Sequence, residues 1–195
     1  MLYRGGRAIA RLILWLMRVK VTGAENLPRE GGVLVCANHV SYWDPVVIGC
    51  LLNRPINFMA KAEFFENRFS GAVFRGLRAF PVKRGSGDRQ AIRRAMELLQ
   101  AGEVVGIFPE GSRNQSGELL KPQLGTAMIA AKTGSPVLPV ACVGGRKRLI
   151  RGWFRPRELR VGQPITMERY QGQKVNSQAL ELISTEIVNG IDSLL

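Results

Sequence analysis

Residues 88–108 read DRQAIRRAMELLQAGEVVGIF, and this stretch decides the fold class. Its first part predicts a helix over 88–101, because Asp88 stands at the start, apolar residues recur at helical spacing, and Gly102 follows as a stop signal. Its second part, 103–108, is a short apolar run typical of a buried strand. A helix that leads directly into a buried strand indicates a largely parallel sheet.

The same alternation continues on both sides of this stretch. Toward the N terminus it predicts strands at 32–37, 56–60 and 79–82, and helices at 45–52 and 70–77, the latter as one helix or two short ones. Toward the C terminus it predicts a helix at 123–132, strands at 136–143 and 158–161, and a helix from Ser177. No repeat, low-complexity tract or long linker divides the chain. We therefore predict one α/β domain over residues 21–195, a sandwich with a largely parallel central sheet.

Composition limits the class of function. The 195 residues are 46% hydrophobic, which suffices for one core and excludes a disordered tail, a collagen-like fibre and a disulfide scaffold. Lys and Arg number 28 against 15 Asp and Glu, a net charge of +13 that favours anionic partners. A nucleic-acid-binding domain is a distant alternative, since only 7% of residues are aromatic and no recognised module is present.

Cysteine and histidine usage bears on redox state and metals. Cys36, Cys50 and Cys142 are far apart and form no CxxC pair, so we expect reduced, buried thiols. His39 is the only histidine, which excludes a multi-histidine metal site, and we expect no metal.

The first twenty residues predict a helix that lies on a membrane surface. Their longest apolar run, 12–17, is too short for a secretory signal or a spanning helix. On a helical wheel the arginines gather on one side, and Ile9, Leu12, Leu16 and Val19 take the other. The residues expected at the membrane interface are Arg4, Arg7, Arg11, Leu12, Trp15, Leu16 and Arg18. The alternative is that the apolar face packs on the protein's own core.

The histidine is followed five positions later by an aspartate. An unbroken helix would place His39 and Asp44 about 140° apart, so they can cooperate only if the chain between them is irregular. Irregularity is expected, because His39 follows a strand and Asp44-Pro45 opens a helix. Asp44 then has two compatible roles, as a helix N-cap and as the acceptor of an imidazole N–H. A purely structural histidine is the alternative.

A second candidate site, FPEGSR at 108–113, directly follows the buried strand. Ligand sites of α/β proteins lie at the carboxyl ends of strands. Gly111 allows a tight turn, and Arg113 offers a planar fork of donors for phosphate or carboxylate. The alternative is an ordinary turn with a solvated arginine.

Four ordered blocks resemble the glycerolipid acyltransferases, in particular the 1-acylglycerol-3-phosphate (lysophosphatidic acid) acyltransferases. The blocks span roughly residues 20–165 and read NHVSYWDP at 38–45, AFPVKR at 79–84, FPEGSR at 108–113 and VLPV at 137–140. The resemblance implies the family's single-domain α/β acyltransferase fold. It also implies transfer of a fatty acyl group from acyl-CoA or acyl carrier protein to the sn-2 hydroxyl of 1-acylglycerol 3-phosphate, with no bound cofactor.

The resemblance also assigns roles to residues. His39 and Asp44 are the expected catalytic pair, with Arg84, Glu110, Gly111, Ser112 and Arg113 binding substrate and Arg84 and Arg113 holding the acceptor's phosphate. Phe80 and Pro139 are expected either near the acyl chain or as structural residues. Glu110 is expected to orient Arg113, because a carboxylate beside a phosphate is unfavourable.

The chemistry of acyl transfer agrees with this assignment. A thiolate departs readily from a thioester, so the difficult step is attack by a weakly acidic alcohol. A neutral imidazole can take the alcohol's proton, and an aspartate can hold its tautomer. Glycerol 3-phosphate or another lysolipid is the alternative acceptor. We expect the protein on the cytoplasmic side of the cell membrane, peripheral or monotopic, with lysophospholipid, acyl thioester and an anionic surface as partners and no nucleic acid.

Overall fold

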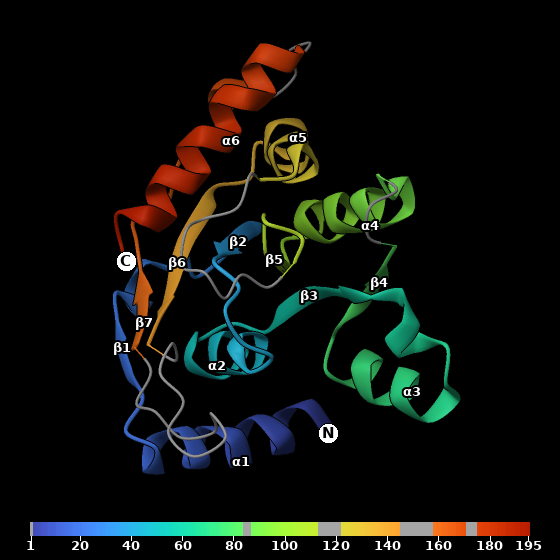
Figure 1. Cartoon of the computed structure of the whole chain (residues 1–195), viewed down its shortest axis with the longest axis vertical. Helices are drawn as coiled ribbons and strands as arrows, with labels where there is room; N and C mark the ends of the chain where they lie inside the picture. Colours follow the sequence, from blue (N-terminus) through green and yellow to red (C-terminus); the bar gives the residue numbers. More distant parts are fainter. Residues whose placement is uncertain (1, 84–86, 113–121, 145–157, 171–174) are drawn as a thin grey trace.

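The computed structural model describes residues 2–83, 87–112, 122–144, 158–170 and 175–195, with only the backbone of residues 2–4. Figure 1 shows a central sheet with the strand order β1-β7-β6-β2-β5-β3-β4. Neighbouring strands run parallel except β6 and β7, which confirms the predicted α/β domain with a mostly parallel sheet. The strands are β1 (Lys20–Thr22), β2 (Val33–Ala37), β3 (Ile56–Lys61), β4 (Phe80–Val82), β5 (Val104–Ile107), β6 (Val137–Val143) and β7 (Glu158–Val161).

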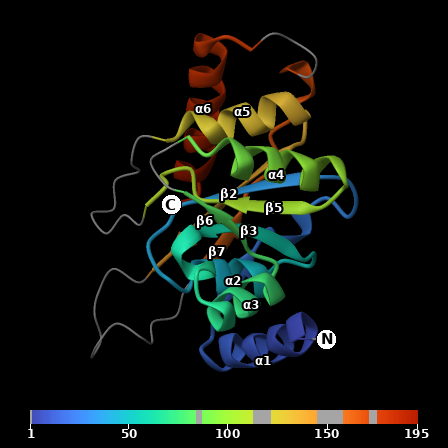
Figure 2. The ribbon, with the colours of Figure 1, turned by 90° about the vertical axis from the view of Figure 1, so that its right-hand side faces the viewer.

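Helices lie on both sides of the sheet (Figure 2). On one side are α2 (Asp44–Leu51), α3 (Arg68–Gly76) and, packed outside α2, α1 (Leu2–Leu16). On the other side are α4 (Arg89–Gln100), α5 (Leu124–Thr133) and α6 (Ser177–Asp192). Short 3₁₀ helices occur at η1 (Ala24–Asn26), η2 (Ala62–Phe65) and η4 (Glu168–Tyr170).

The buried strand β2 supplies two cores, because successive side chains of a strand point to opposite faces. Val33 and Val35 join the core on the α2 side, and Leu34 and Cys36 join the core under α4, α5 and α6. A strand that is buried on both faces reads as a continuous apolar run, which is why residues 32–37 were recognisable in the sequence.

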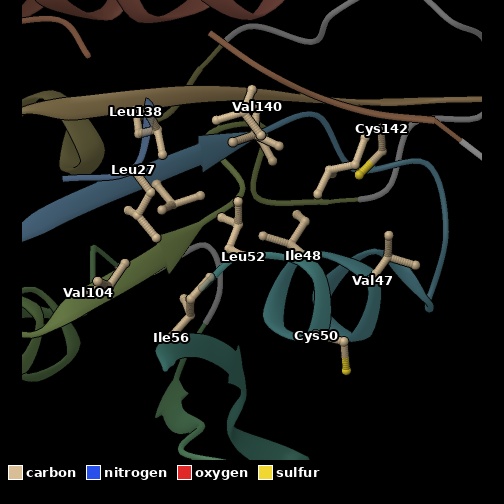
Figure 3. Close-up of a cluster of buried hydrophobic side chains, with 14 of the residues drawn as sticks. Leu27, Val47, Ile48, Cys50, Leu52, Ile56, Val104, Leu138, Val140 and Cys142 are labelled. Carbon is tan, nitrogen blue, oxygen red and sulfur yellow. The ribbon is translucent and has the colours of Figure 1, made fainter. Parts of the chain in front are cut away.

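The core on the α2 side fixes the helix that begins at Asp44. Figure 3 shows Ile48 and Leu52 between α2 and the sheet, in the same cluster of buried side chains as Leu138 and Val140 of β6. Ile48 and Leu52 are fully buried, and burying such a side chain contributes roughly 1.5–3 kcal/mol. The position of Asp44 is therefore anchored by packing further along its own helix.

The predicted helix over 88–101 is present as α4, and its cap confirms the reason for the prediction. The Asp88 carboxylate accepts hydrogen bonds from the backbone N–H groups of Gln90 (3.0 Å) and Ala91 (3.1 Å). Gly102 follows with φ of 78°, a conformation that favours glycine.

The N-terminal helix differs from its prediction in length. It ends at Leu16 rather than near residue 20, and Arg18 has φ of 53°, outside the helical region. Lys20 already belongs to β1, a short strand that the sequence did not reveal. Arg18 therefore does not share a helical face with Arg7 and Arg11.

The orientation of α1 corrects the prediction of a basic face that contacts lipid. Arg7 donates from Nη2 to the carbonyl oxygen of Leu52, and Arg11 donates from Nε to that of Cys50 at 2.6 Å. Both arginines thus bind the carboxyl end of α2, where a helix has unpaired carbonyls and a partial negative charge. The side chains of Ile9, Leu12, Ile13, Trp15 and Leu16 are exposed. Within the described residues, no helix has both the length and the apolar composition needed to cross a membrane.

Candidate active site

The two sequence motifs meet where strands β2 and β5 end. These strands are parallel neighbours, with Cys36 opposite Ile107, so the segments that follow them lie side by side at one edge of the sheet. The first segment carries His39 and the second carries Phe108 and Glu110. This is the edge at which α/β folds place ligands.

His39 and Asp44 form a hydrogen-bonded pair. The distance from His39 Nδ1 to Asp44 Oδ2 is 3.1 Å, and the two residues are 7% and 0% exposed. The chain between strand and helix is irregular, as predicted, and this irregularity brings the two side chains together. With Asp44 ionised, the imidazole proton resides on Nδ1 and the lone pair on Nε2.

Backbone groups around the turn hold the Asp44 carboxylate. Its Oδ2 atom accepts hydrogen bonds from the backbone N–H groups of Val40 (2.8 Å) and Ser41 (2.6 Å). These donors precede α2, and the capping position of that helix is Trp43, so the predicted N-cap role of Asp44 is corrected. A buried carboxylate needs such donors, because burial of an unpaired charge costs several kcal/mol.

The FPEGSR segment supports His39 from two directions. Glu110 is buried, and its Oε1 atom accepts the backbone N–H of His39 at 3.3 Å. The ring of Phe108 stacks on the imidazole, with centroids 4.0 Å apart and planes at 18°. Gly111 donates its N–H to the Phe108 carbonyl at 3.0 Å with φ of 69°, which confirms the predicted tight turn.

Asn38 is a site residue that sequence reasoning missed. Its side chain donates to the carbonyl of Cys142 at 3.2 Å and accepts the N–H of Cys142 at 2.7 Å. This reciprocal pair ties the end of β2 to β6, directly before His39. A polar residue at the end of a fully apolar strand was the signal that could have revealed it.

A pocket of about 350 Å³ lies beside the His39–Asp44 pair. Phe108 and Glu110, which contact His39, also line the pocket, and so do Gly111 and Ser112. The apolar lining further includes Met59, Val82, Ala91, Ile92, Ile107 and Ile129, and the polar lining includes Lys83, Asp88, Gln123 and Thr126. The pocket therefore combines an apolar interior with polar groups, as small-molecule sites do.

Asp88 fixes one side of the pocket. Its Oδ2 atom accepts the backbone N–H of Lys83 at 2.9 Å. This bond is the largest cause of a pKa for Asp88 below the ordinary value, with the N–H groups of Ala91 and Gln90 contributing as well. The carboxylate thus joins the end of β4 to the start of α4.

The structure describes some of the remaining predicted site residues but not all of them. Arg84 and Arg113 lie outside the described residues, but their described neighbours Lys83 and Ser112 both line the pocket. Phe80 is buried in the core with α4 and α5, and Pro139 of β6 packs near Gly162 and Gly190. Among the described residues, no three His, Cys, Asp or Glu side chains gather as a metal site would require.

Comparison with known proteins gives consistent matches. A family model described as Acyltransferase matches residues 18–143. The chain is 34% identical over 151 residues to a 1-acyl-sn-glycerol-3-phosphate acyltransferase of Bacillus subtilis, covering 75% of this chain and 73% of that protein. It is 37% identical over 136 residues to a lyso-ornithine lipid O-acyltransferase of Pseudomonas aeruginosa, covering 68% of this chain and 50% of that protein.

A solved structure is similar over nearly the whole chain. The crystal structure of the 1-acyl-sn-glycerophosphate (LPA) acyltransferase PlsC from Thermotoga maritima superposes with a TM-score of 0.75 at 26% identity. The match covers 98% of this chain and 79% of that one.

Proposed function

Because the chain belongs to the Acyltransferase family, we propose that it acylates the sn-2 hydroxyl of 1-acylglycerol 3-phosphate to form phosphatidic acid. The donor is a thioester, either acyl-CoA or an acyl group carried on acyl carrier protein. The observation that carries the proposal is the buried His39–Asp44 pair beside a pocket lined by the FPEGSR segment. The similar protein from Bacillus subtilis, which is named for this reaction, supports the choice of acceptor.

In the proposed mechanism, His39 acts as the general base. The Nε2 lone pair takes the proton of the acceptor hydroxyl while the hydroxyl oxygen attacks the carbonyl carbon of the thioester. The carbon–sulfur bond then breaks, and the thiolate departs and receives the proton from the imidazolium. Asp44 holds the tautomer and stabilises the positive charge that forms on the imidazole during attack. No acyl-enzyme forms, so both substrates bind together.

The groups around the pair keep the imidazole in place. Glu110 fixes the backbone of His39, and Phe108 restricts its ring to one plane. Both act as positioning residues. Precise placement is worth several orders of magnitude in rate, because the base must lie within hydrogen-bond reach of the attacking hydroxyl.

The pocket accounts for recognition of a phosphorylated lipid. We assign the acceptor's phosphate to Arg84 and Arg113, whose neighbours Lys83 and Ser112 line the pocket. The apolar interior, formed in part by Ile92 and Ile107, suits an acyl chain.

The N-terminal helix α1 supplies the proposed membrane contact. Its exposed apolar side chains face away from α2, and the helix carries no acidic residue in its first turn. Partial burial of about five such side chains in the headgroup boundary, at roughly 1 kcal/mol each, gives several kcal/mol of membrane affinity. The lysolipid then reaches His39 from the cytoplasmic leaflet.

A panel of acceptors and donors tests the proposal. Thiol release is measured with 1-acylglycerol 3-phosphate, glycerol 3-phosphate and a lyso-ornithine lipid, each with acyl-CoA and with acyl carrier protein. The lyso-ornithine lipid is included because a relative named for that acceptor is 37% identical. We expect 1-acylglycerol 3-phosphate to give the highest kcat/KM. A higher kcat/KM for either competitor would reassign the acceptor, and no thiol release with any acceptor would overturn the function.

A further inference from the structure

We infer that helix α3 is a second membrane-contact element, which inserts Phe69 into the same anionic bilayer surface as α1. The inference rests on the proposed function, since a lipid acceptor requires contact with a bilayer. It goes beyond the N-terminal helix by fixing how the whole domain sits on the membrane.

The exposed stripe on α3 is the first observation. Phe69 is 80% exposed, more than any other large apolar side chain that the structure describes. Val73 and Leu77, the residue that directly follows α3, come at intervals of four residues and are also exposed, so the three lie along one side of the helix and its carboxyl end.

The opposite side of α3 is firmly packed. The ring of Phe74 stacks on Phe64 with centroids 4.9 Å apart, and Phe65 lies 5.7 Å from the same ring. Gly71 is buried against η2, where an added Cβ would lie 3.0 Å from the Phe65 carbonyl oxygen. The direction of the exposed stripe is therefore fixed by the structure.

The distribution of exposed apolar side chains points to one broad surface. Of the fifteen exposed large apolar side chains in the described residues, five lie on α1 and four lie on η2, on α3 or directly after α3. The other six are Val21, Tyr42, Trp43, Leu124, Leu182 and Leu195. Figures 1 and 2 show α1 and α3 together at one end of the molecule, on the side of the sheet opposite α4, α5 and α6.

The charge of this surface identifies the partner. Helix α3 contains no acidic residue and carries the exposed Arg68 next to Phe69, whereas its Arg75 lies over the ring of Phe65 on the packed side. Helix α1 contains no acidic residue either. The exposed Glu66 is the acidic residue just before α3. Exposed apolar side chains on both helices, with the exposed Arg68 beside Phe69, suit a bilayer with anionic headgroups, which accepts apolar groups over a wide area and attracts positive charge.

A site-specific probe tests the contact, with a matched control on the far face. Phe69→Cys and Leu182→Cys are each labelled with an environment-sensitive thiol dye. The native cysteines are buried, and burial raises the pKa of Cys36 and Cys50, so they react slowly. Each labelled protein is added to vesicles of phosphatidylcholine with about one third phosphatidylglycerol.

The dye at position 69 should shift to the blue and be quenched by nitroxide lipids, and the dye at position 182 should do neither. Phe69→Ser should weaken vesicle binding about tenfold, and Leu182→Ser should leave it unchanged. A dye at position 69 that keeps its aqueous spectrum while the protein sediments with the vesicles would overturn the proposal. So would a spectral shift that follows protein concentration without vesicles, which would assign the stripe to a second copy of the chain.

Two further measurements separate this inference from the proposed function. If Phe69→Ser binds vesicles normally but uses acyl carrier protein less well than acyl-CoA, α3 binds the acidic carrier and the membrane contact is wrong. Turnover of a water-soluble short-chain acceptor without vesicles tests the chemistry alone. If the wild type is inactive in this assay, the proposed function is wrong whatever the dye reports. If the wild type is active but the dye at position 69 does not respond to vesicles, only the α3 membrane contact is wrong.

Discussion

Replacing Asp44 by asparagine should nearly abolish turnover and cost little stability. The side chain is fully buried, and three N–H groups converge on Oδ2, from the His39 ring and from the backbone at Val40 and Ser41. The asparagine oxygen can still accept the two backbone N–H groups, so the turn survives. The substitution removes the negative charge beside the imidazole.

The structure sets the expected sizes of the two effects. Bonds to a carboxylate are roughly twice as strong as neutral ones, but the buried charge also carries a desolvation penalty. We expect Asp44→Asn to lower the free energy of unfolding by about 1–2 kcal/mol, which lowers Tm by about 2–8 °C for a chain of this length. The imidazolium loses its stabilising charge, so kcat should fall by a factor of about 10²–10⁴.

A double-mutant cycle distinguishes this account from a structural role. Thiol release and thermal unfolding are measured for Asp44→Asn, for His39→Ala and for the two combined. Because Asp44 acts through His39, the double variant should be no slower than His39→Ala alone. Two independent, multiplying losses of kcat, or an Asp44→Asn variant within about threefold of wild type, would refute the reasoning.

Further predictions concern the surroundings of the pair. Glu110→Ala should lower the free energy of unfolding, measured in urea, by about 1–3 kcal/mol, because the backbone N–H of His39 loses its acceptor. Glu110→Gln should keep most of the wild-type stability, because the amide oxygen can still accept this N–H. Identical urea midpoints for the two variants would contradict this. Arg11→Gln should speed proteolysis within α1, because the bond to the Cys50 carbonyl is lost; an unchanged rate would count against that bond. The pKa of Asp88 is lowered by folding, so its ionised form stabilises the protein above about pH 4, and this contribution disappears as pH falls through the lowered value. The Tm difference between wild type and Asp88→Ala should therefore shrink on acidification, and a constant difference would exclude the carboxylate as its source.

Local patterns in the sequence predicted most of the elements, because each depends on residues close together in the chain. The cap at Asp88 and the apolar run of β2 are examples. Strand β1 was missed because its three residues are exposed and carry no buried pattern. Its assignment depends on pairing with β7, from Lys20 to Glu158, which no local signal encodes.

The site was predicted in part for the same reason. The spacing of His39 and Asp44 was visible, and so was the turn at Gly111. The roles of Asn38 and Arg11 were not, because each binds a backbone carbonyl contributed by a distant segment. Every residue has a backbone carbonyl, so the sequence does not indicate which carbonyl a given side chain binds. A helical wheel likewise shows that α1 has two faces but not which of them meets α2.

The most direct test of the central claim compares wild type with His39→Ala in a single assay. Phosphatidic acid formation from 1-acylglycerol 3-phosphate and an acyl thioester is followed at saturating substrate, and thermal unfolding is recorded for both proteins. The account predicts product formation by wild type and a kcat at least about a hundredfold lower for a folded His39→Ala variant. A folded variant that keeps more than about a tenth of the wild-type kcat would contradict the assignment of His39 as the general base.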